Sequence, residues 1–542
     1  MSVSFVCNYS QFVVKFALYK NMKNFLILTA LLAFAVICGS LGEQQTQANS
    51  SINQNKLANP PVLFPANQAK MVNPDVKLKL TFGSVPKIGN SGKIRIYDAA
   101  DDRLVDTLDM SIPAGLTKSV DPAIRAKGYI KSPYSYERTK RATNRDTKPG
   151  TGSAGATDTT SDYQLTIIGG FTDGFRFYPI TIDGNTATIH PHHDLLEYGK
   201  SYYVQIDAEV FPNSDFAGIL GKNWSFSTKA KAPKANATKL TVNADGTGDF
   251  NTVQGALDFV PDHSKKRITI NVKNGLYQEI IYARNKDNVT LLGESQEKTH
   301  VRYANNEVFN PHPANIRTNP EKGTFPSRRA AVTIDNCNDF HLVNMTIETT
   351  SPGQAEGLLI MGERNILSKV TVIGAGDALQ ANGRIYIVDS TVMGTGDTIL
   401  SRGTLFCERC TLKSTQVFLW TRNGKEDHGN VFKDSTFIAT RQPTNIARSP
   451  KNGDFSYPFA EDILLNCTLV NITPEGWGDA DKGGNVKFWE YNSKNADGTP
   501  VDVSKRVTWS RQLDQLKDAK LIADYSRSEF VLAGWKPKLS VK

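Results

Sequence analysis

Two aspartates, Asp377 and Asp397, have the spacing in this chain that best suits catalysis. They are 20 residues apart, and each lies six residues after the Thr of a short recurring motif, Thr371 for the first and Thr391 for the second. If the motif copies stack as successive coils, the two carboxylates lie at equivalent points on strands about 4.8 Å apart. Two carboxylates that close cannot both ionise easily, so the pair supplies an anion, usable as nucleophile or base, and a protonated general acid.

Two other interpretations of this pair stay open from the residues alone. Aspartates are common in turns because their side chains hydrogen-bond the nearby backbone. Stacked carboxylates are also ligands that Ca²⁺ prefers.

The motif that sets the register predicts the fold. Its copies contain one Thr each, and these residues are Thr346, Thr371, Thr391, Thr411, Thr436 and Thr468. Each copy ends a run in which apolar and polar residues alternate, which is typical of a half-buried strand, and no helical pattern separates the copies. Strands that repeat every 20 to 32 residues in this way predict a parallel β-solenoid.

Several segments around the two aspartates carry the motifs of one family. In chain order these segments are Val242–Phe250, Gly275–Glu279, Gly353–Leu358, Gly376–Leu379, Gly394–Ile399, Pro474–Trp477, Glu490–Asn492 and Trp509–Leu513. Their order and spacing resemble the pectin methylesterases, which are carbohydrate esterases. The resemblance implies a right-handed parallel β-helix, and an all-β chain overall.

The same resemblance implies roles for individual residues. Asp397 matches the nucleophile that attacks the ester carbonyl, and Asp377 matches the acid that protonates departing methanol and then acts as base on water. Gln354 matches a donor to the oxyanion. The family's arginine that orients the nucleophile is best matched by Arg448, with Arg422 as the competing candidate.

A charge argument accompanies the choice of arginine. A cation within about 4 to 6 Å lowers the pKa of a carboxylate by about 1 to 3 units. We therefore expect the arginine to mark the nucleophile, Asp397, and not the acid. The alternative for Arg448 and for Arg422 is a solvated charge on the surface of the solenoid.

Three positions depart from the family pattern. Gly376 replaces the Gln that normally precedes the acid, Pro450 replaces a substrate-stacking Trp, and Thr398–Ser401 lacks an aromatic residue. Trp420 and Trp477 are the candidates to stack on a sugar ring instead, and ordinary packing is the alternative for both. The sequence thus supports ester chemistry more firmly than pectin specificity.

The segment before the predicted solenoid of residues 240–542 has a different sequence pattern. Residues 60–230 contain short alternating strands bounded by Gly, Pro, Asn and Asp, which predicts an antiparallel sandwich that resembles bacterial immunoglobulin-like modules. A mobile insertion is expected near 140–160 and a linker over 231–239. The segment His190–Asp194 suggests metal binding, but we expect a turn with solvated histidines.

The first residues predict export. Residues 1–42 contain an apolar run after lysines, typical of a signal peptide that is too short to span a membrane, and translation is expected to start at Met22. Residues 43–59 are expected to be flexible. The protein should be secreted, periplasmic or on the cell surface, and a lipid anchor at Cys38 is the less favoured alternative.

The four cysteines beyond this leader, Cys337, Cys407, Cys410 and Cys467, are predicted to be buried free thiols, and no zinc site is expected.

These observations predict a pectin methylesterase that acts as a monomer without metal or cofactor. A net charge of +9 suits a polyanionic polysaccharide partner, and no basic-aromatic pattern indicates nucleic acid. Three alternatives stay open: an esterase for another ester or thioester, a Ca²⁺-dependent polysaccharide lyase, and a non-catalytic glycan-binding solenoid.

Overall fold

The computed structural model describes residues 60–115, 163–166, 168, 175–212, 215–310, 328–452, 455–478 and 485–540. Residues 59–542 form one compact unit, which is built mostly of β-strands. The predicted signal peptide, Cys38, the segment 43–59 and the insertion near 140–160 lie outside the described residues.

The first part of the described chain contains two sheets around one core. The four-stranded antiparallel sheet has the order β1 (Val62–Phe64), β3 (Leu78–Thr81), β9 (Thr186–Ile189), β8 (Ile180–Asp183). The five-stranded sheet has the order β2 (Ala69–Val72), β11 (Ser225–Thr228), β10 (Ser201–Ile206), β4 (Lys93–Asp98), β5 (Leu104–Asp109). Short elements are β6 (Leu165–Thr166), β7 (Phe175–Arg176) and the 3₁₀ turn η3 (Ala208–Val210).

Alternate residues of both sheets point into a shared core, as a sandwich requires. Leu78 and Leu80 of β3 meet Val204 and Ile206 of β10 there, and all four are buried. The polar residues between them are partly exposed, so the period-two pattern of the sequence places one face inward. The immunoglobulin-like assignment and the exact domain boundaries stay predictions.

The predicted turn of solvated histidines is wrong. His190 and His192 are both buried, and His192 Nδ1 lies 2.7 Å from Asp106 Oδ1. His193 Nε2 lies 2.5 Å from Asp258 Oδ2. Local composition suggested a solvated turn, but Asp106 of β5 and Asp258 of a helix bind His192 and His193, and His190 is buried with its ring beside the Thr181 hydroxyl.

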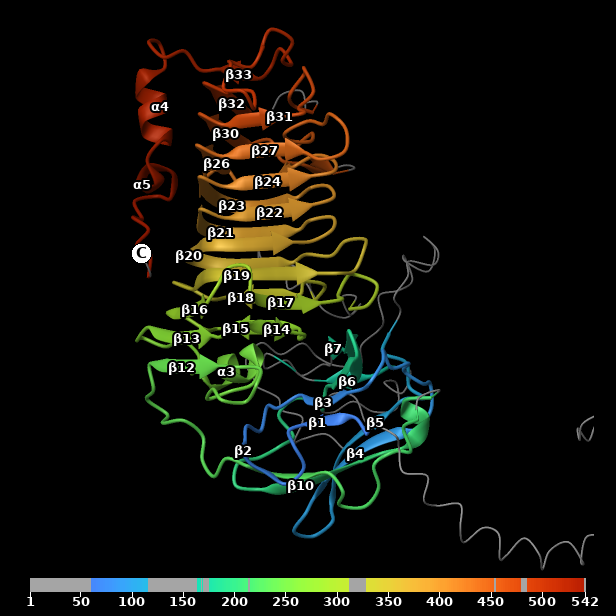
Figure 1. Ribbon diagram of the computed structural model, residues 1–542. Coiled ribbons are helices and arrows are strands. Elements are labelled where there is room, and N and C mark those ends of the chain that lie inside the picture. The colour runs from blue at the N-terminus through green and yellow to red at the C-terminus, as the bar shows by residue number, and fades with distance from the viewer. Residues whose placement is uncertain are drawn as a thin grey trace, which may run out of the picture. The chain divides into compact units, whose positions relative to one another are not determined.

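The remaining strands form a single 20-stranded parallel sheet that winds into the predicted β-helix (Figure 1). Its first half comprises β12 (Lys239–Val242), β13 (Ile268–Val272), β14 (Gly275–Tyr277), β15 (Ile281–Arg284), β16 (Val289–Gly293), β17 (Thr299–Tyr303), β18 (Val332–Asp335), β19 (His341–Thr349), β20 (Leu358–Ile373) and β21 (Leu379–Val388). Its second half comprises β22 (Thr391–Gly394), β23 (Ile399–Glu408), β24 (Thr411–Ser414), β25 (Leu419–Thr421), β26 (Asn430–Lys433), β27 (Thr436–Ala439), β30 (Glu461–Leu465), β31 (Thr468–Val470), β32 (Lys487–Tyr491) and β33 (Arg511–Gln512). A separate hairpin joins β28 (Lys451–Asn452) to β29 (Phe455–Ser456).

The recurring Thr residues form one continuous ladder, which confirms the predicted register. Each Thr pairs with the next one along the chain, from Thr346 with Thr371 through to Thr436 with Thr468. Two residues before each Thr stands a residue with positive φ that turns the corner into the strand, and these residues are Asn344, Lys369, Asp389, Arg409, Asp434 and Asn466. The cost of this conformation is lowest for Asn and Asp, which fill most of the corners.

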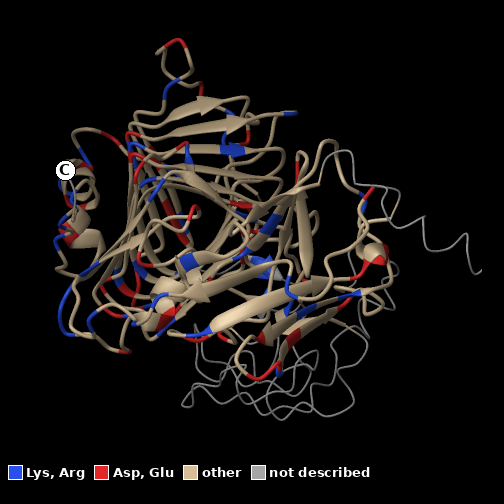
Figure 2. Cartoon of the chain, turned by 60° about the horizontal axis from the view of Figure 1, so that its bottom comes forward, with Lys and Arg blue, Asp and Glu red and all other residues tan. Residues whose placement is uncertain are grey.

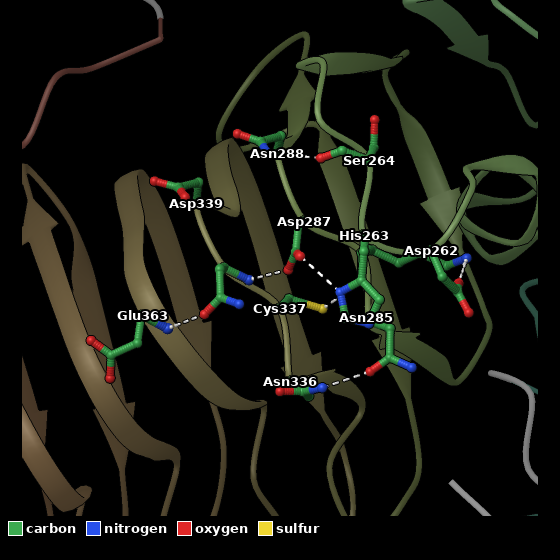
Figure 3. A network of polar contacts seen from close by, with 12 residues as sticks. Asp262, His263, Ser264, Asn285, Asp287, Asn288, Asn336, Cys337, Asp339 and Glu363 are labelled. Carbon is green, nitrogen blue, oxygen red and sulfur yellow. Dashed lines mark hydrogen bonds and ion pairs between the residues drawn. The ribbon is translucent and has the colours of Figure 1, made fainter. Parts of the chain in front are cut away.

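Polar side chains also tie neighbouring coils together at another corner, as Figure 3 shows. Asn336 donates from Nδ2 to Asn285 Oδ1 at 2.7 Å, and the backbone N–H of Asn338 donates to Asp287 Oδ1 at 2.8 Å. Each bond joins equivalent points of two coils, so the stack is held by side chains as well as by its backbone ladder.

Three helices cover the solenoid. Helix α3 (Val253–Phe259) starts at Thr252, whose Oγ1 accepts from the N–H of Gly255 at 3.0 Å, and it buries Val253 and Leu257 in the core of the first coils. Helices α4 (Ala519–Tyr525) and α5 (Ser528–Val531) run along the outside of the later coils (Figure 1). They pack on a second apolar cluster made by outward-facing strand residues.

The four cysteines of the solenoid are buried and unbridged, as predicted. Cys407, Cys410 and Cys467 belong to its hydrophobic core, where burial keeps the pKa of the Cys467 thiol at about 12.

Candidate active site

Asp377 and Asp397 lie at equivalent points of adjacent coils, as their spacing predicts. Gly376 forms a parallel bridge with Gly396, and the backbone N–H of Asp377 donates to Gly396 O at 3.1 Å. Gly376 also bridges to Gln354 on the preceding coil. One line across three coils therefore carries the two carboxylates and the side-chain amide.

Both aspartates have left-handed backbone conformations. The φ angle is 60° at Asp377 and 42° at Asp397. This conformation is uncommon outside Gly, Asn and Asp and is often found at functional sites. It places each carboxylate at the corner where one strand ends and β21 or β23 begins.

Arg448 pairs with the proposed nucleophile, as predicted. Its Nη1 lies 2.9 Å from Asp397 Oδ2. The other oxygen, Asp397 Oδ1, is buried and has no hydrogen-bond partner among the described residues. Its lone pairs are therefore not committed to any described donor, although the atom itself is covered in this conformation.

The expectation that an arginine marks only the nucleophile is wrong. Asp377 also has one, since Arg329 Nη2 lies 3.0 Å from Asp377 Oδ2. Arg329 is shared, because its Nε also donates to both oxygens of Glu356, at 2.7 and 2.8 Å. Two carboxylates thus divide the charge of Arg329.

Burial raises the pKa of Asp377, against the opposing charges of Arg329, Arg422 and Arg402. Burial also raises the pKa of Asp397, where Arg448 opposes the rise and Asp377 adds to it. The Asp377 side chain is 5% exposed and that of Asp397 is 17% exposed. Desolvation, which favours the protonated form, therefore weighs more on Asp377.

Gln354 is oriented by the same arginine. Arg329 Nη1 donates to Gln354 Oε1 at 2.8 Å. A guanidinium can only donate, so the atom that faces it must be the amide oxygen, and Gln354 Nε2 is left to donate elsewhere. Gln354 is partly exposed, which makes that donor accessible.

Trp420 lies among arginines beside this line. The guanidinium carbons of Arg422 and Arg448 are 3.3 and 4.2 Å from its ring centroid. Arg422 also lies 5.2 Å from the centroid of Tyr457. Trp420 is 6% exposed, so in this structure its ring holds arginines in place and offers little surface to a sugar.

Trp477 belongs to the hydrophobic core. It is 1% exposed, packs against Phe488 and donates from Nε1 to Glu490 Oε1 at 3.1 Å. Stacking on a sugar would require the ring to leave this core, so we do not include Trp477 in the substrate surface.

Sequence reasoning missed Arg329, Arg402 and Tyr457. Arg402 is aligned with Asn382 on the neighbouring strand, and its pKa is lowered to about 10 by burial and by Arg422. Arg329 comes before the strand of its coil, far from any motif, and no repeat signal pointed to it. An ion pair 48 residues apart in sequence is visible only once the coils are stacked.

Residues 239–534 match the family model described as Pectinesterase. The chain belongs to the pectinesterase family. The match covers the described solenoid and its covering helices, and leaves the two-sheet part before β12 outside.

Among relatives of this pectinesterase-family chain, Pectinesterase QRT1 of Arabidopsis thaliana is 29% identical over 323 residues, covering 54% of this chain and 80% of the relative. Probable pectinesterase/pectinesterase inhibitor 19 of the same plant is 25% identical over 338 residues, covering 58% and 60%. The chain thus spans less than two thirds of that second relative. The solved pectin methylesterase from carrot has a TM-score of 0.45 at 20% identity, covering 56% of this chain and 95% of the carrot chain.

The departures from the family pattern take a definite form here. Pro450 is buried, and its carbonyl accepts from the N–H of Tyr457 at 2.9 Å. Gly376 leaves open the place beside Gln354, where a Cβ would meet Gly353 O at 3.3 Å. No group of three or more His, Cys, Asp or Glu with the geometry of a metal site occurs in the described part of the chain.

Proposed function

We propose that this protein hydrolyses methyl esters of galacturonate units in pectin and releases methanol. The observation that carries the proposal is the line of Gln354, Asp377 and Asp397 on three adjacent coils, with Arg448 reaching Asp397 from the second coil beyond it. Membership of the pectinesterase family supports the reaction class.

In the first half of the reaction, a carboxylate oxygen of Asp397 attacks the ester carbonyl carbon. The charge that develops on the carbonyl oxygen is stabilised by Gln354 Nε2, and a preorganised donor of this kind is typically worth about 3 to 4 kcal/mol. As the carbon–methoxyl bond breaks, Asp377 gives its proton to the leaving oxygen. Methanol departs, and an anhydride joins Asp397 to the sugar carboxyl group.

In the second half, Asp377 is ionised and takes a proton from water. The hydroxide attacks the anhydride carbon, and the bond to Asp397 breaks. The products are the sugar carboxylic acid and free Asp397, and Asp377 has regained its proton. One ester and one water thus give one acid and one methanol.

The assignment of roles follows from charge and burial. Asp397 has Arg448 as its direct ion pair, which favours the anion needed for attack. Asp377 is more buried and shares Arg329 with Glu356, so its protonated form is less disfavoured. Arg329 acts as a positioning residue because it orients both Asp377 and Gln354.

The test is methanol release from highly methylated pectin by the full chain and by Asp397→Asn. We expect release by the parent and loss of at least about 10³-fold in the variant, because the amide cannot form the acyl-enzyme. Asp389→Asn is the matched control. Asp389 also has positive φ and an arginine partner, Arg409 at 2.7 Å, but it lies at the Thr-ladder corner and should leave the rate unchanged.

Each alternative gives a different result. Methanol release that a chelator abolishes would point to metal-dependent chemistry and contradict this mechanism. Unsaturated sugar products would identify a lyase. If the parent binds pectin without turnover, and Asp397→Asn binds equally well, the glycan-binding alternative replaces the esterase.

The proposed location is outside the cytoplasm, on the evidence of the leader-like composition of residues 1–42. No helix of the described residues has the length and apolar character to cross a membrane. We also propose that the two-sheet part of residues 60–230 is a separate module that spaces or presents the solenoid, joined to it near 231–239.

A further inference from the structure

A cavity lies on the outer face of the β-helix where its helical cover ends. Helices α4 and α5 pack on outward residues of the later coils, including Ile366 and Phe406. The chain then continues past Trp535 toward the earlier coils, beside which its end is marked in Figure 1. Between this segment and the ladder that runs from Thr290 through His341 to Ile366, a cavity of about 450 Å³ opens.

The cavity has an excess of positive charge. Arg267, Lys536 and Lys538 line it, and the acidic residue that lines it, Asp339, is already paired with Arg364 at 2.6 Å. Lys536 pairs with Glu529 at 3.1 Å, whereas Lys538 has no ion pair within the described ranges. Over the described chain as a whole, Figure 2 shows both basic and acidic positions. The imbalance at the cavity favours an anionic ligand.

The Arg267 part of the wall is held in place before any ligand arrives. Arg267 Nη1 donates to Val289 O at 3.2 Å and to Thr290 Oγ1 at 3.1 Å. A guanidinium held in this way has further N–H groups in a set orientation and matches a carboxylate well.

One residue that lines the cavity has a buried polar atom without a partner. His341 is 6% exposed, and its Nδ1 makes no hydrogen bond to any described residue. Burial and the neighbouring Arg267 lower the pKa of His341 to about 4, against the charge of Asp339. The neutral ring can exchange a hydrogen bond with a ligand hydroxyl, which would satisfy this atom.

The half-buried Trp535 supplies the apolar part of the wall. An aromatic side chain next to cations and hydroxyl groups suits a sugar that bears a carboxylate. The volume of the cavity falls within the usual range for ligand sites.

We propose that this cavity binds an acidic oligosaccharide, a short run of de-esterified galacturonate, at a second site on the face of the solenoid formed by β13, β16 and β19. The choice of sugar rests on the proposed function, since de-esterified galacturonate is its product. A neutral sugar makes no use of the charges of Arg267 and Lys538, and the hydroxyls of Thr269 and Thr290 suit a sugar better than a small inorganic anion. The site would retain the product chain on the enzyme.

The experiment is calorimetric titration of the full chain with fully de-esterified hexagalacturonate. We expect one binding step to weaken about tenfold in Lys538→Glu and in Trp535→Ala, with Lys538→Glu the safer variant because its side chain is exposed. Lys517→Glu, the same charge change at another exposed position near the C-terminus, should leave that step unchanged. Arg448→Gln should weaken a different binding step, the one at the candidate active site.

The proposal is overturned if Lys538→Glu leaves every step unchanged, if Lys517→Glu weakens the same step equally, or if a neutral hexasaccharide binds as tightly. Methanol release measured on the same samples separates this proposal from the proposed function. If the parent shows the Lys538-dependent binding step but releases no methanol, the proposed esterase function is contradicted and the proposed binding site is still supported. The Lys538→Glu variant should release methanol from a short methylated oligosaccharide at the parent rate.

Discussion

At the scale of single residues, charge partition distinguishes two aspartates that occupy equivalent places. Both have positive φ, both are largely buried, and each contacts an arginine. The difference is that Glu356 competes for Arg329, whereas Arg448 pairs with Asp397. The two arginine–aspartate pairs have similar distances, yet the sharing of Arg329 favours the protonated form of Asp377 and the undivided charge of Arg448 favours the anion of Asp397.

Arg448→Gln should therefore move the acid limb of the activity profile. Asp397 must be ionised to attack, so kcat/KM falls as pH drops through the pKa of Asp397. Removing the cation raises that pKa, and the fall should begin about one pH unit higher. Methanol release measured from pH 4 to 9 tests this, and an unmoved acid limb would contradict the role of Arg448.

Arg329→Met should reduce both stability and rate. It leaves Glu356 buried without its cation, a change that typically costs about 3 to 5 kcal/mol. It also frees the Gln354 amide to rotate, and loss of one aligned oxyanion donor lowers kcat about 10² to 10³-fold.

The double variant Arg329→Met/Glu356→Gln separates these effects. It removes both charges, so unfolding in urea should return toward the parent while kcat stays low. Recovery of kcat together with stability would mean that Arg329 is structural only.

At the scale of the element, the coil register decides which side chains meet. Position 376 lies in line with Gln354 and Gly396, one coil from each. The coil spacing brings a side chain at 376 beside the Gln354 amide. The absence of a side chain at Gly376 therefore removes a donor from the site without disturbing the stack.

Gly376→Gln should raise kcat by adding a second donor to the oxyanion. The new Cβ would meet Gly353 O at 3.3 Å, which a small shift relieves, and the φ angle of Gly376 lies outside the positive range. We expect a gain of about tenfold, less than the full value of a preorganised donor. Gly376→Met, similar in size without a donor, should give no gain, and an equal gain would contradict the oxyanion explanation.

At the scale of the whole molecule, one carboxylate inside the solenoid couples its stability to pH. Asp462 is fully buried and accepts from Thr421 Oγ1 at 2.8 Å and from Asn430 Nδ2 at 2.8 Å. Burial raises its pKa to about 7, against these hydrogen bonds. The native state therefore holds a proton that the unfolded chain has lost above about pH 4.

The contribution of Asp462 to the stability of the fold should fall as pH rises from about 4 to 7. At this position the unfolded state binds fewer protons in this window, so the share of the unfolding free energy that Asp462 contributes decreases, by an amount on the order of 4 kcal/mol, and then levels off. Asp462→Asn should remove this contribution, so the difference in unfolding free energy between parent and variant should change between pH 5 and pH 8, as urea unfolding at the two pH values can show. Asp434→Asn, the same change at an exposed corner, should leave the slope as in the parent.

The spacing and alternation of residues are enough to predict the strand repeat, the parallel stacking and the register that places Asp377 beside Asp397. Local patterns carry this information because alternation sets which side chains face inward and the spacing of the Thr residues sets the length of each coil. Arg448 was found through its motif in the same way.

The environment of those residues, by contrast, depends on how the whole chain folds. Arg329 and Asp377 are brought together by stacking, the His190–Asp194 segment is buried by partners from other elements, and Trp477 lies in the core where its motif suggested a surface. Charge sharing, desolvation and burial depend on everything within a few ångströms of an atom. Most of these neighbouring atoms belong to residues that are distant in the chain, so a local sequence pattern cannot predict them.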